Sequence, residues 1–148
     1  MDICFLGSIY GGSEKRADYK RLIERCKDYG NVLTEHVGSE SAVEEAIGKK
    51  KISWVEHEQD IRNIKRCDAV IAGVTIPSTG VGYGIATAEH FGKKVLCVYD
   101  LAYDRPQSNV ILGNRNLIVK GYFSIEEAVK ILDSFMRETV GVVPIDEI

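Results

Sequence analysis

Short apolar runs alternate along this chain with longer segments in which apolar residues recur at helical spacing. The apolar runs are residues 3–6, 69–72, 95–99 and 117–119, and residues 31–36 are expected to add a fifth strand. A run that is apolar at successive positions is typical of a strand buried on both faces by helices. The alternation therefore predicts an α/β fold, a three-layer sandwich around a five-stranded parallel sheet.

The segments between these runs carry helix signals. An apolar stripe over residues 15–29 ends at Gly30, the residue type that commonly follows a helix. Capping-box patterns at Ser53 and Ser124 predict helices from there to Cys67 and near the C-terminus, and residues 80–91 predict a helix of small residues. Residues 38–52 lack a stable apolar period and are expected to form a mobile flap.

The chain length sets the domain organisation and the topology. A chain of 148 residues can bury a sufficient core without disulfides or a metal ion, so one domain over residues 1–148 is expected. Five parallel strands in this length favour a Rossmann-like sandwich with the flavodoxin-like strand order. In such folds, ligands bind beyond the carboxyl ends of the strands.

Charge and hydropathy restrict the partners. With 19 Lys and Arg against 22 Asp and Glu, the net charge of −3 disfavours a nucleic acid strand, whereas a single small phosphate compound stays open. No stretch approaches the roughly 18 apolar residues of a membrane span, and the first residues lack the pattern of a secretion signal. We therefore expect a cytoplasmic protein without a membrane partner.

The cysteines and histidines do not form a recognisable site. Cys4, Cys26, Cys67 and Cys97 are widely spaced, so they are expected to be buried free thiols rather than ligands of zinc or an iron–sulfur cluster. The sequence lacks a Gly-x-Ser-x-Gly elbow and a loop cysteine beside a histidine, so serine and cysteine nucleophiles are excluded. His57 and His90 are expected on helix faces rather than at a metal. No metal or cofactor is expected.

Two glycine-rich loops follow strands and are expected to face one crevice. The first covers residues 7–13, and the second follows Gly73 and leads to Gly80, Gly82 and Gly84. Backbone N–H groups of such loops can bind an anion, although neither loop matches the P-loop or the dinucleotide-binding pattern. The alternative is that these glycines serve ordinary turns and close packing.

Asp60 is the carboxylate with the most informative position. It lies three residues after His57 and four before Ile64, at the edge of the apolar stripe of its helix. This position predicts a partly buried side chain directed toward the sheet, and burial favours the protonated form that can donate a proton. The alternative is a surface aspartate paired with Arg62 or Lys65.

Several motifs together resemble one known superfamily. They are FLGSIYGG at residues 5–12, VLTEHV at 32–37, HEQD at 57–60, DAVIAGVTIPSTGVGY at 68–83 and RPQS at 105–108. This set resembles the nucleoside 2-deoxyribosyltransferase superfamily, and within it the 2′-deoxynucleoside 5′-monophosphate N-hydrolase branch. The resemblance spans nearly the whole chain and implies cleavage of the N-glycosidic bond to a free base and deoxyribose 5-phosphate.

The resemblance also implies a site. It implies that Asp60 orients or protonates a group at the reacting centre, and that Ser108 reaches the site of the neighbouring subunit in a homodimer. The substrate-binding residues that it implies, with the loop residues beside them, are Gly7, Ser8, Ile9, Tyr10, Gly11, Gly12, Ser78, Gly80, Gly82, Gly84 and Ser108. The ligand would be a nucleoside 5′-monophosphate.

Three positions depart from the family pattern. Gly84 stands where the family has a nucleophilic Glu, Cys4 stands in place of an active-site Tyr, and Tyr10 in place of a phosphate-facing Arg. Weak or absent turnover is therefore expected, and Gly84 is expected to leave a space for a water, an added carboxylate or a bulkier ligand. Glu89 is a poor substitute, since five helical residues carry it about 7.5 Å onward and roughly 140° around the helix. The alternatives are a non-catalytic nucleotide-binding module and a deoxyribosyltransferase.

Overall fold

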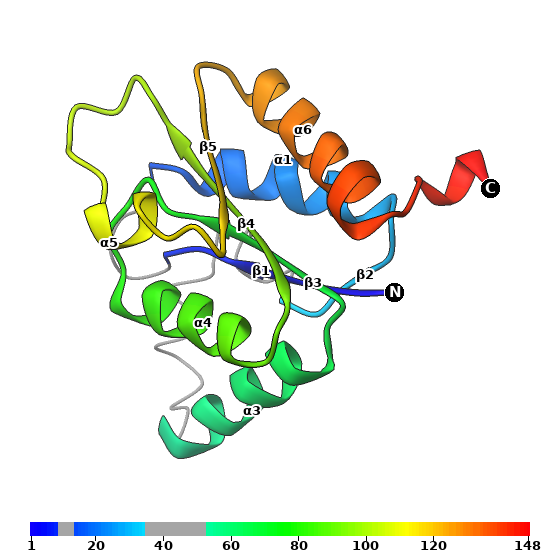
Figure 1. Cartoon of the computed structure of the whole chain (residues 1–148), viewed down its shortest axis with the longest axis horizontal. Coiled ribbons are helices and arrows are strands. Elements are labelled where there is room, and N and C mark those ends of the chain that lie inside the picture. Colours follow the sequence, from blue (N-terminus) through cyan, green and yellow to red (C-terminus); the bar gives the residue numbers. More distant parts are fainter. Residues whose placement is uncertain (9–13, 35–52) are drawn as a thin grey trace.

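Five parallel strands form one sheet within residues 1–8, 14–34 and 53–148, which are the residues that the computed structural model describes (Figure 1). The strand order is β2-β1-β3-β4-β5. The strands are β1 (Asp2–Leu6), β2 (Asn31–Val32), β3 (Ala69–Gly73), β4 (Lys94–Asp100) and β5 (Ile118–Tyr122). The predicted fold class, with its five-stranded parallel sheet in the flavodoxin-like order, is confirmed.

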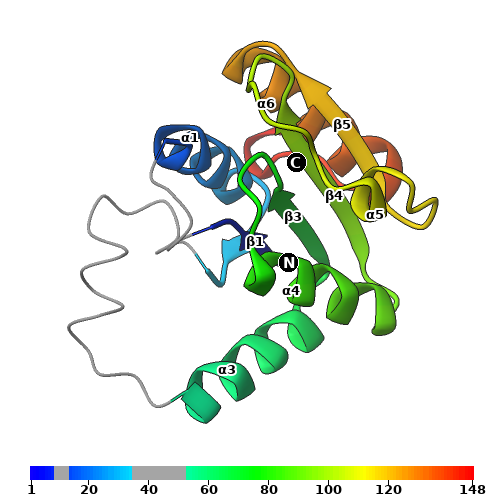
Figure 2. The ribbon, with the colours of Figure 1, turned by 90° about the vertical axis from the view of Figure 1, so that its left-hand side faces the viewer.

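Helices cover both faces of this sheet (Figure 2). The helices are α1 (Arg16–Lys27), α3 (Ser53–Arg66), α4 (Thr79–His90), α5 (Asn109–Leu112) and α6 (Ile125–Ser134). Helices α1 and α6 lie on one face, whereas α3 and α4 lie on the other. A π-helical turn (Phe135–Val140) and a 3-10 turn (Ile145–Glu147) follow α6. Among the described residues, no helix is long and apolar enough to cross a membrane.

Two apolar cores result from the period-two alternation of the strands. In β1, Ile3 and Phe5 face α1 and α6, whereas Cys4 faces α3 and α4. All five residues of β3 are buried, as expected for a central strand covered on both sides. Burial of each large side chain, such as Phe5 or Leu132, contributes about 1.5–3 kcal/mol to the two cores.

The second and fifth strands differ from the predicted ranges. β2 ends at Val32 because the side chain of Thr34, rather than its backbone, pairs with β1. Thr34 Oγ1 accepts from the Phe5 N–H at 2.7 Å and donates to the Phe5 carbonyl oxygen at 2.6 Å. β5 continues to Tyr122, paired with Asp100 of β4, and so extends past the predicted residues 117–119. The predicted flap at residues 38–52 lies outside the described residues.

The predicted cap of the last helix is confirmed. Ser124 Oγ accepts from the Glu127 N–H at 3.2 Å, and Glu127 Oε2 in return accepts from the Phe123 N–H at 2.8 Å. These contacts satisfy N–H groups that an uncapped first turn leaves unpaired. Helix α4 begins in the same way, because Ser78 Oγ accepts from the Val81 N–H at 3.3 Å.

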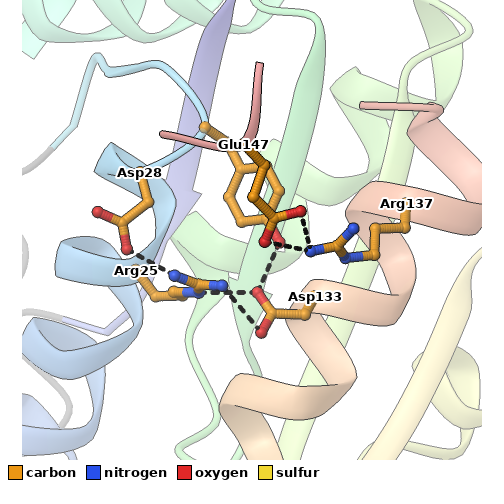
Figure 3. A network of polar contacts seen from close by, with 6 residues as sticks. Arg25, Asp28, Asp133, Arg137 and Glu147 are labelled. Atoms are coloured by element: carbon orange, nitrogen blue, oxygen red, sulfur yellow. Dashed lines mark hydrogen bonds and ion pairs between the residues drawn. The ribbon is translucent and has the colours of Figure 1, made fainter. Parts of the chain in front are cut away.

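A polar network joins α1, α6 and the C-terminal segment at the edge of the sheet where α1 ends (Figure 3). Asp133 accepts from Arg25 Nε at 2.8 Å and from the Tyr29 hydroxyl at 2.6 Å. Arg137 donates to Glu147 at 2.8 Å. The Asp28 carbonyl oxygen also accepts from the backbone N–H of residue 145 at 2.7 Å. The network therefore fixes the C-terminal segment against α1.

Replacing Asp133 tests the contribution of this network to stability. Asp133→Asn removes the charge that binds Arg25 and weakens the acceptor of the Tyr29 hydroxyl. We expect the free energy of unfolding to fall by about 1–3 kcal/mol, measured by urea denaturation. Glu126→Gln on the exposed face of α6 is the control and should stay within about 0.5 kcal/mol of the unaltered chain. An equal effect of the two substitutions would contradict a contribution of the Asp133 network to stability.

Candidate active site

The carboxyl ends of β1 and β3 form a topological switch point. From β1 the chain passes over one face to β2, and it returns over the other face to β3 on the far side of β1. Leu6 pairs with Ala72, so the two loops that leave these strands begin side by side. Gly7 and Ser8 therefore begin at the same edge of the sheet as the residues after Gly73, and the expectation that the two loops face one crevice stays a prediction. Ile9, Tyr10, Gly11 and Gly12 lie outside the described residues.

Gly84 faces the end of β1 and helix α3. It is buried, and a Cβ at this position would lie 2.9 Å from Leu6 Cδ1 and 3.7 Å from Ile64 Cδ1. The first of these distances is shorter than a normal contact between carbon atoms. The prediction that Gly84 leaves a space for a water, an added carboxylate or a bulkier ligand is therefore wrong, because the Leu6 side chain occupies the volume that a side chain at 84 would need.

Asp60 lies one helical turn before Ile64 on α3, on the side of the sheet that carries Gly84. The pKa of the neighbouring Cys4 thiol is raised by its hydrogen bond with Cys67, by burial and by the charges of Cys67 and Asp60. Asp60 itself is exposed, so the prediction that it is partly buried is wrong. The reason is the place of α3, which lies on the outer side of α4 and has Ile64 as its buried residue (Figure 2).

An aromatic contact joins α3 to α4 beside Gly84. His57 Nε2 and the Tyr83 hydroxyl are 3.1 Å apart, and the two ring centroids are 5.8 Å apart. His57 thus lies on the helix face, as expected, and no group of three or more potential metal ligands is found among the residues the structure describes. The sequence did not predict that Tyr83 contacts His57. Tyr83 lies directly before Gly84, however, and this position could have marked it as a residue near the site.

A groove of about 620 Å³ lies on the opposite side of α4, between α4 and α5. Ser78, Gly82, Ser108 and Val110 are among its lining residues. Ser108 is exposed directly before α5, and its side chain makes no capping hydrogen bond to that helix. The structure therefore brings Ser78, Gly82 and Ser108 together along this groove, whereas Gly84 faces Leu6 and Ile64 on the other side of α4.

Glu89 lines the same groove between α4 and α5. Its two carboxylate oxygens accept from Asn114 Nδ2 and Asn116 Nδ2, each at 2.8 Å. The Asn116 and Asn114 amides hold the pKa of Glu89 below its ordinary value. These contacts fix the segment after α5 against α4, whereas Gly84 faces Leu6. The geometry thus opposes Glu89 as a substitute for a carboxylate at position 84.

The four cysteines lie in the interior, and at least Cys26 and Cys97 do not offer a nucleophile. All four are buried free thiols, as predicted. Burial raises the pKa of Cys97 to about 12, and burial with the nearby charges of Asp133 and Asp28 raises that of Cys26 to about 12. A thiol with such a pKa is protonated at neutral pH and therefore unreactive.

Comparison with known proteins identifies relatives over most of this chain. Residues 4–121 match the family model described as nucleoside 2-deoxyribosyltransferase. A Nematostella vectensis protein, whose name places it among the 2′-deoxynucleoside 5′-phosphate N-hydrolases, is 45% identical over 123 residues, which cover 81% of this chain and 84% of that protein. The human 5-hydroxymethyl-dUMP N-hydrolase is 42% identical over 112 residues, which cover 74% of this chain and 60% of the human protein.

A solved structure has the same fold. The CMP N-glycosidase of Clostridium botulinum superposes with a TM-score of 0.61 at 21% identity, covering 90% of this chain and 98% of that one. The family match includes β1, β3 and α4, which position Leu6 and Gly84, and the helix that carries Asp60. The predicted resemblance is confirmed, and the chain belongs to the nucleoside 2-deoxyribosyltransferase family.

Proposed function

We propose that this chain binds 2′-deoxynucleoside 5′-monophosphates and hydrolyses their N-glycosidic bond slowly. The observation that carries the proposal is that three separate segments meet near the end of β1: the loop that begins with Gly7 and Ser8, helix α3 with Asp60, and helix α4 with Gly84. The names of the relatives, which are N-hydrolases of deoxynucleoside monophosphates, support the same substrate class.

The phosphate would bind where β1 and β3 end. Ser78 lies at the N-terminus of α4, a helix of 12 residues whose first N–H groups favour an anion. Gly7 and Ser8 begin the neighbouring loop at the same edge. Tyr10 replaces a cationic side chain of the family pattern, so backbone N–H groups and Ser78 would provide much of the phosphate recognition.

The reaction breaks the bond between C1′ of the sugar and a nitrogen of the base. The bonding electrons leave with the base, which gains a proton, and a water oxygen bonds to C1′ and loses a proton. Enzymes that cleave glycosidic bonds commonly use two carboxylates for this chemistry, one of them close enough to bond to the sugar. Gly84 cannot supply that bond, so Asp60 supports departure of the base without a covalent intermediate, and turnover is slow.

One observation favours a second candidate, a non-catalytic nucleotide-binding module. Leu6 and Ile64 pack against Gly84 and form an apolar wall where a carboxylate would otherwise act. Calorimetric titration that shows nucleotide binding without release of base would support this candidate. A third candidate, base exchange between nucleosides, would be supported if an added second base appeared in a new nucleoside.

Incubation with each deoxynucleoside monophosphate, 5-hydroxymethyl-dUMP included, tests the proposed function. Free base and deoxyribose 5-phosphate would be detected by chromatography in equal amounts. Base release from one of these nucleotides supports the N-hydrolase. If no base is released but a nucleotide binds, the binding module is correct, and if no nucleotide binds, the substrate class is wrong.

A carboxylate restored at position 84 should accelerate base release. We expect Gly84→Glu to raise the rate by about 100-fold or more, because the covalent route becomes available. The Glu side chain has to displace Leu6, whose Cδ1 lies 2.9 Å from the position of the new Cβ. The double variant Leu6→Ala with Gly84→Glu should therefore be faster than Gly84→Glu alone.

Gly82→Glu is the matched control for this prediction. It adds the same side chain to the same helix, and a Cβ there meets no atom within 4 Å. Gly82 lines the groove on the other side of α4, so its carboxylate cannot reach the end of β1. An equal gain in rate from Gly82→Glu would contradict the assignment of position 84.

Removal of the Asp60 charge should slow the reaction without a loss of stability. In the Gly84→Glu background, Asp60→Asn is expected to lower the rate of base release by about 100-fold, the order typical of acid–base assistance. Because Asp60 is exposed, the midpoint of urea denaturation should stay unchanged. Glu58→Gln, also exposed on α3, is the control. Equal rates in the two variants would exclude Asp60 from the reaction.

The proposal includes a homodimer in which Ser108 reaches the site of the partner. Val110, beside Ser108 in the groove, is 82% exposed, which is unusual for a large apolar side chain. Val110→Asp should dissociate the dimer in sedimentation velocity, because a carboxylate is costly in an apolar interface. Val143→Asp, at an exposed valine of the C-terminal segment, should leave the dimer intact. A monomeric unaltered chain would refute the dimer.

A further inference from the structure

Lys15 is a largely buried cation at the start of α1, and it follows the first glycine-rich loop in the chain. Its side chain is 15% exposed, and its Nζ binds the Asp100 carboxylate and lies 3.7 Å from Asp18 Oδ2. Lys15 occupies the N-cap position of α1, where the helix dipole disfavours a positive charge. The place of Lys15 therefore depends on the two carboxylates that face it.

Asp100 connects Lys15 to residues 101–108, the segment between β4 and α5, which we call the Ser108 loop. One carboxylate oxygen of Asp100 binds Lys15, and the other accepts from the Ala102 N–H at 2.8 Å. The Asp100 side chain is 16% exposed. Because both members of the ion pair are mostly buried, removal of one leaves the other without compensation, which costs more than the loss of a surface ion pair.

Two further contacts hold the Ser108 loop. Lys15 Nζ lies 5.8 Å from the centroid of the Tyr103 ring, within the range of a cation–π interaction. Near the end of the loop, Gln107 Nε2 donates to the Thr75 carbonyl oxygen at 3.4 Å. Thr75 is 2% exposed, and its Oγ1 also accepts from the Asp100 N–H at 2.9 Å. The loop is therefore attached at both ends.

Ser108 lies at the surface where this loop ends. It is exposed, and its side chain makes no capping hydrogen bond to α5. Helix α5 has only four residues, too few for a helix that is stable by itself. The position of Ser108 thus depends on the loop before it, and Lys15 ties that loop to α1.

We propose that Lys15 is a positioning residue, which acts through Asp100 and Tyr103 to hold the loop that presents Ser108. The inference rests on the proposed function, in which Ser108 reaches the nucleotide site of the partner subunit. Lys15 then adds to nucleotide affinity without touching the nucleotide, because a loop already held in place loses less conformational entropy when the ligand binds. Its effect on affinity passes through Ser108.

Lys15→Met tests the inference, because it removes the charge and keeps a long side chain. In the ligand-free variant we expect the amide hydrogens of residues 101–103 to exchange about tenfold faster. The Kd of the deoxynucleoside monophosphate that binds most tightly should rise about fivefold. Asp100→Asn, which removes the other charge of the pair, should give the same two changes. Lys15→Arg should restore both, since it keeps a cation for Asp100 and Tyr103. Lys20→Met, at an exposed lysine of α1, is the matched control and should change neither.

A Ser108→Ala background separates positioning from other roles of Lys15. In that background Lys15→Met should not weaken nucleotide binding further, because the group that the loop presents is already absent. A further loss of affinity would overturn the inference, since Lys15 would then act on the ligand directly or through the stability of the fold. Unchanged exchange of residues 101–103 in Lys15→Met would also overturn it. Faster exchange in Lys15→Met, with an unaltered chain that binds no nucleotide, would support the hold on the loop and refute the proposed function.

Discussion

The parallel pairing of β1 with β3 determines where ligands can bind in this chain. It brings Leu6 beside Ala72, so that two loops distant in sequence begin at one edge of the sheet. It also places the crossovers on opposite faces, with α1 on one side and α3 on the other. Gly84 meets Leu6 only because this pairing fixes the elements that carry them, and the proposed role of Asp60 depends on the same pairing.

In the proposed site, apolar packing takes the place of the carboxylate that the family resemblance implies at position 84. Leu6 and Ile64 close over Gly84, so the helix gains apolar contacts at the position where the family pattern has a nucleophile. An apolar wall excludes water but offers no negative charge to a sugar that becomes positive in the transition state. In the proposed function, the same arrangement would allow a nucleotide to bind but would lack the carboxylate that contributes most to catalysis.

Local patterns in the sequence predicted the elements, whereas tertiary contacts determined the site. The apolar runs and the Ser124 cap are local signals, and both correspond to observed structure. β2 is short because Thr34 contacts Phe5, a residue 29 positions away. Exposure of Asp60 follows from the outward place of α3, and the filling of the space at Gly84 follows from the direction of the Leu6 side chain. No periodicity encodes these long-range contacts.

The network around Asp133 lies at the edge of the sheet opposite the ligand edge. It ties α1, α6 and the C-terminal segment together without using any residue of the candidate site. The Asp133 network and the proposed site thus lie at separate ends of the strands. Substitutions at the ligand edge therefore leave this network intact. A chain with this fold can lose a catalytic side chain, and acquire a new specificity, while it stays folded.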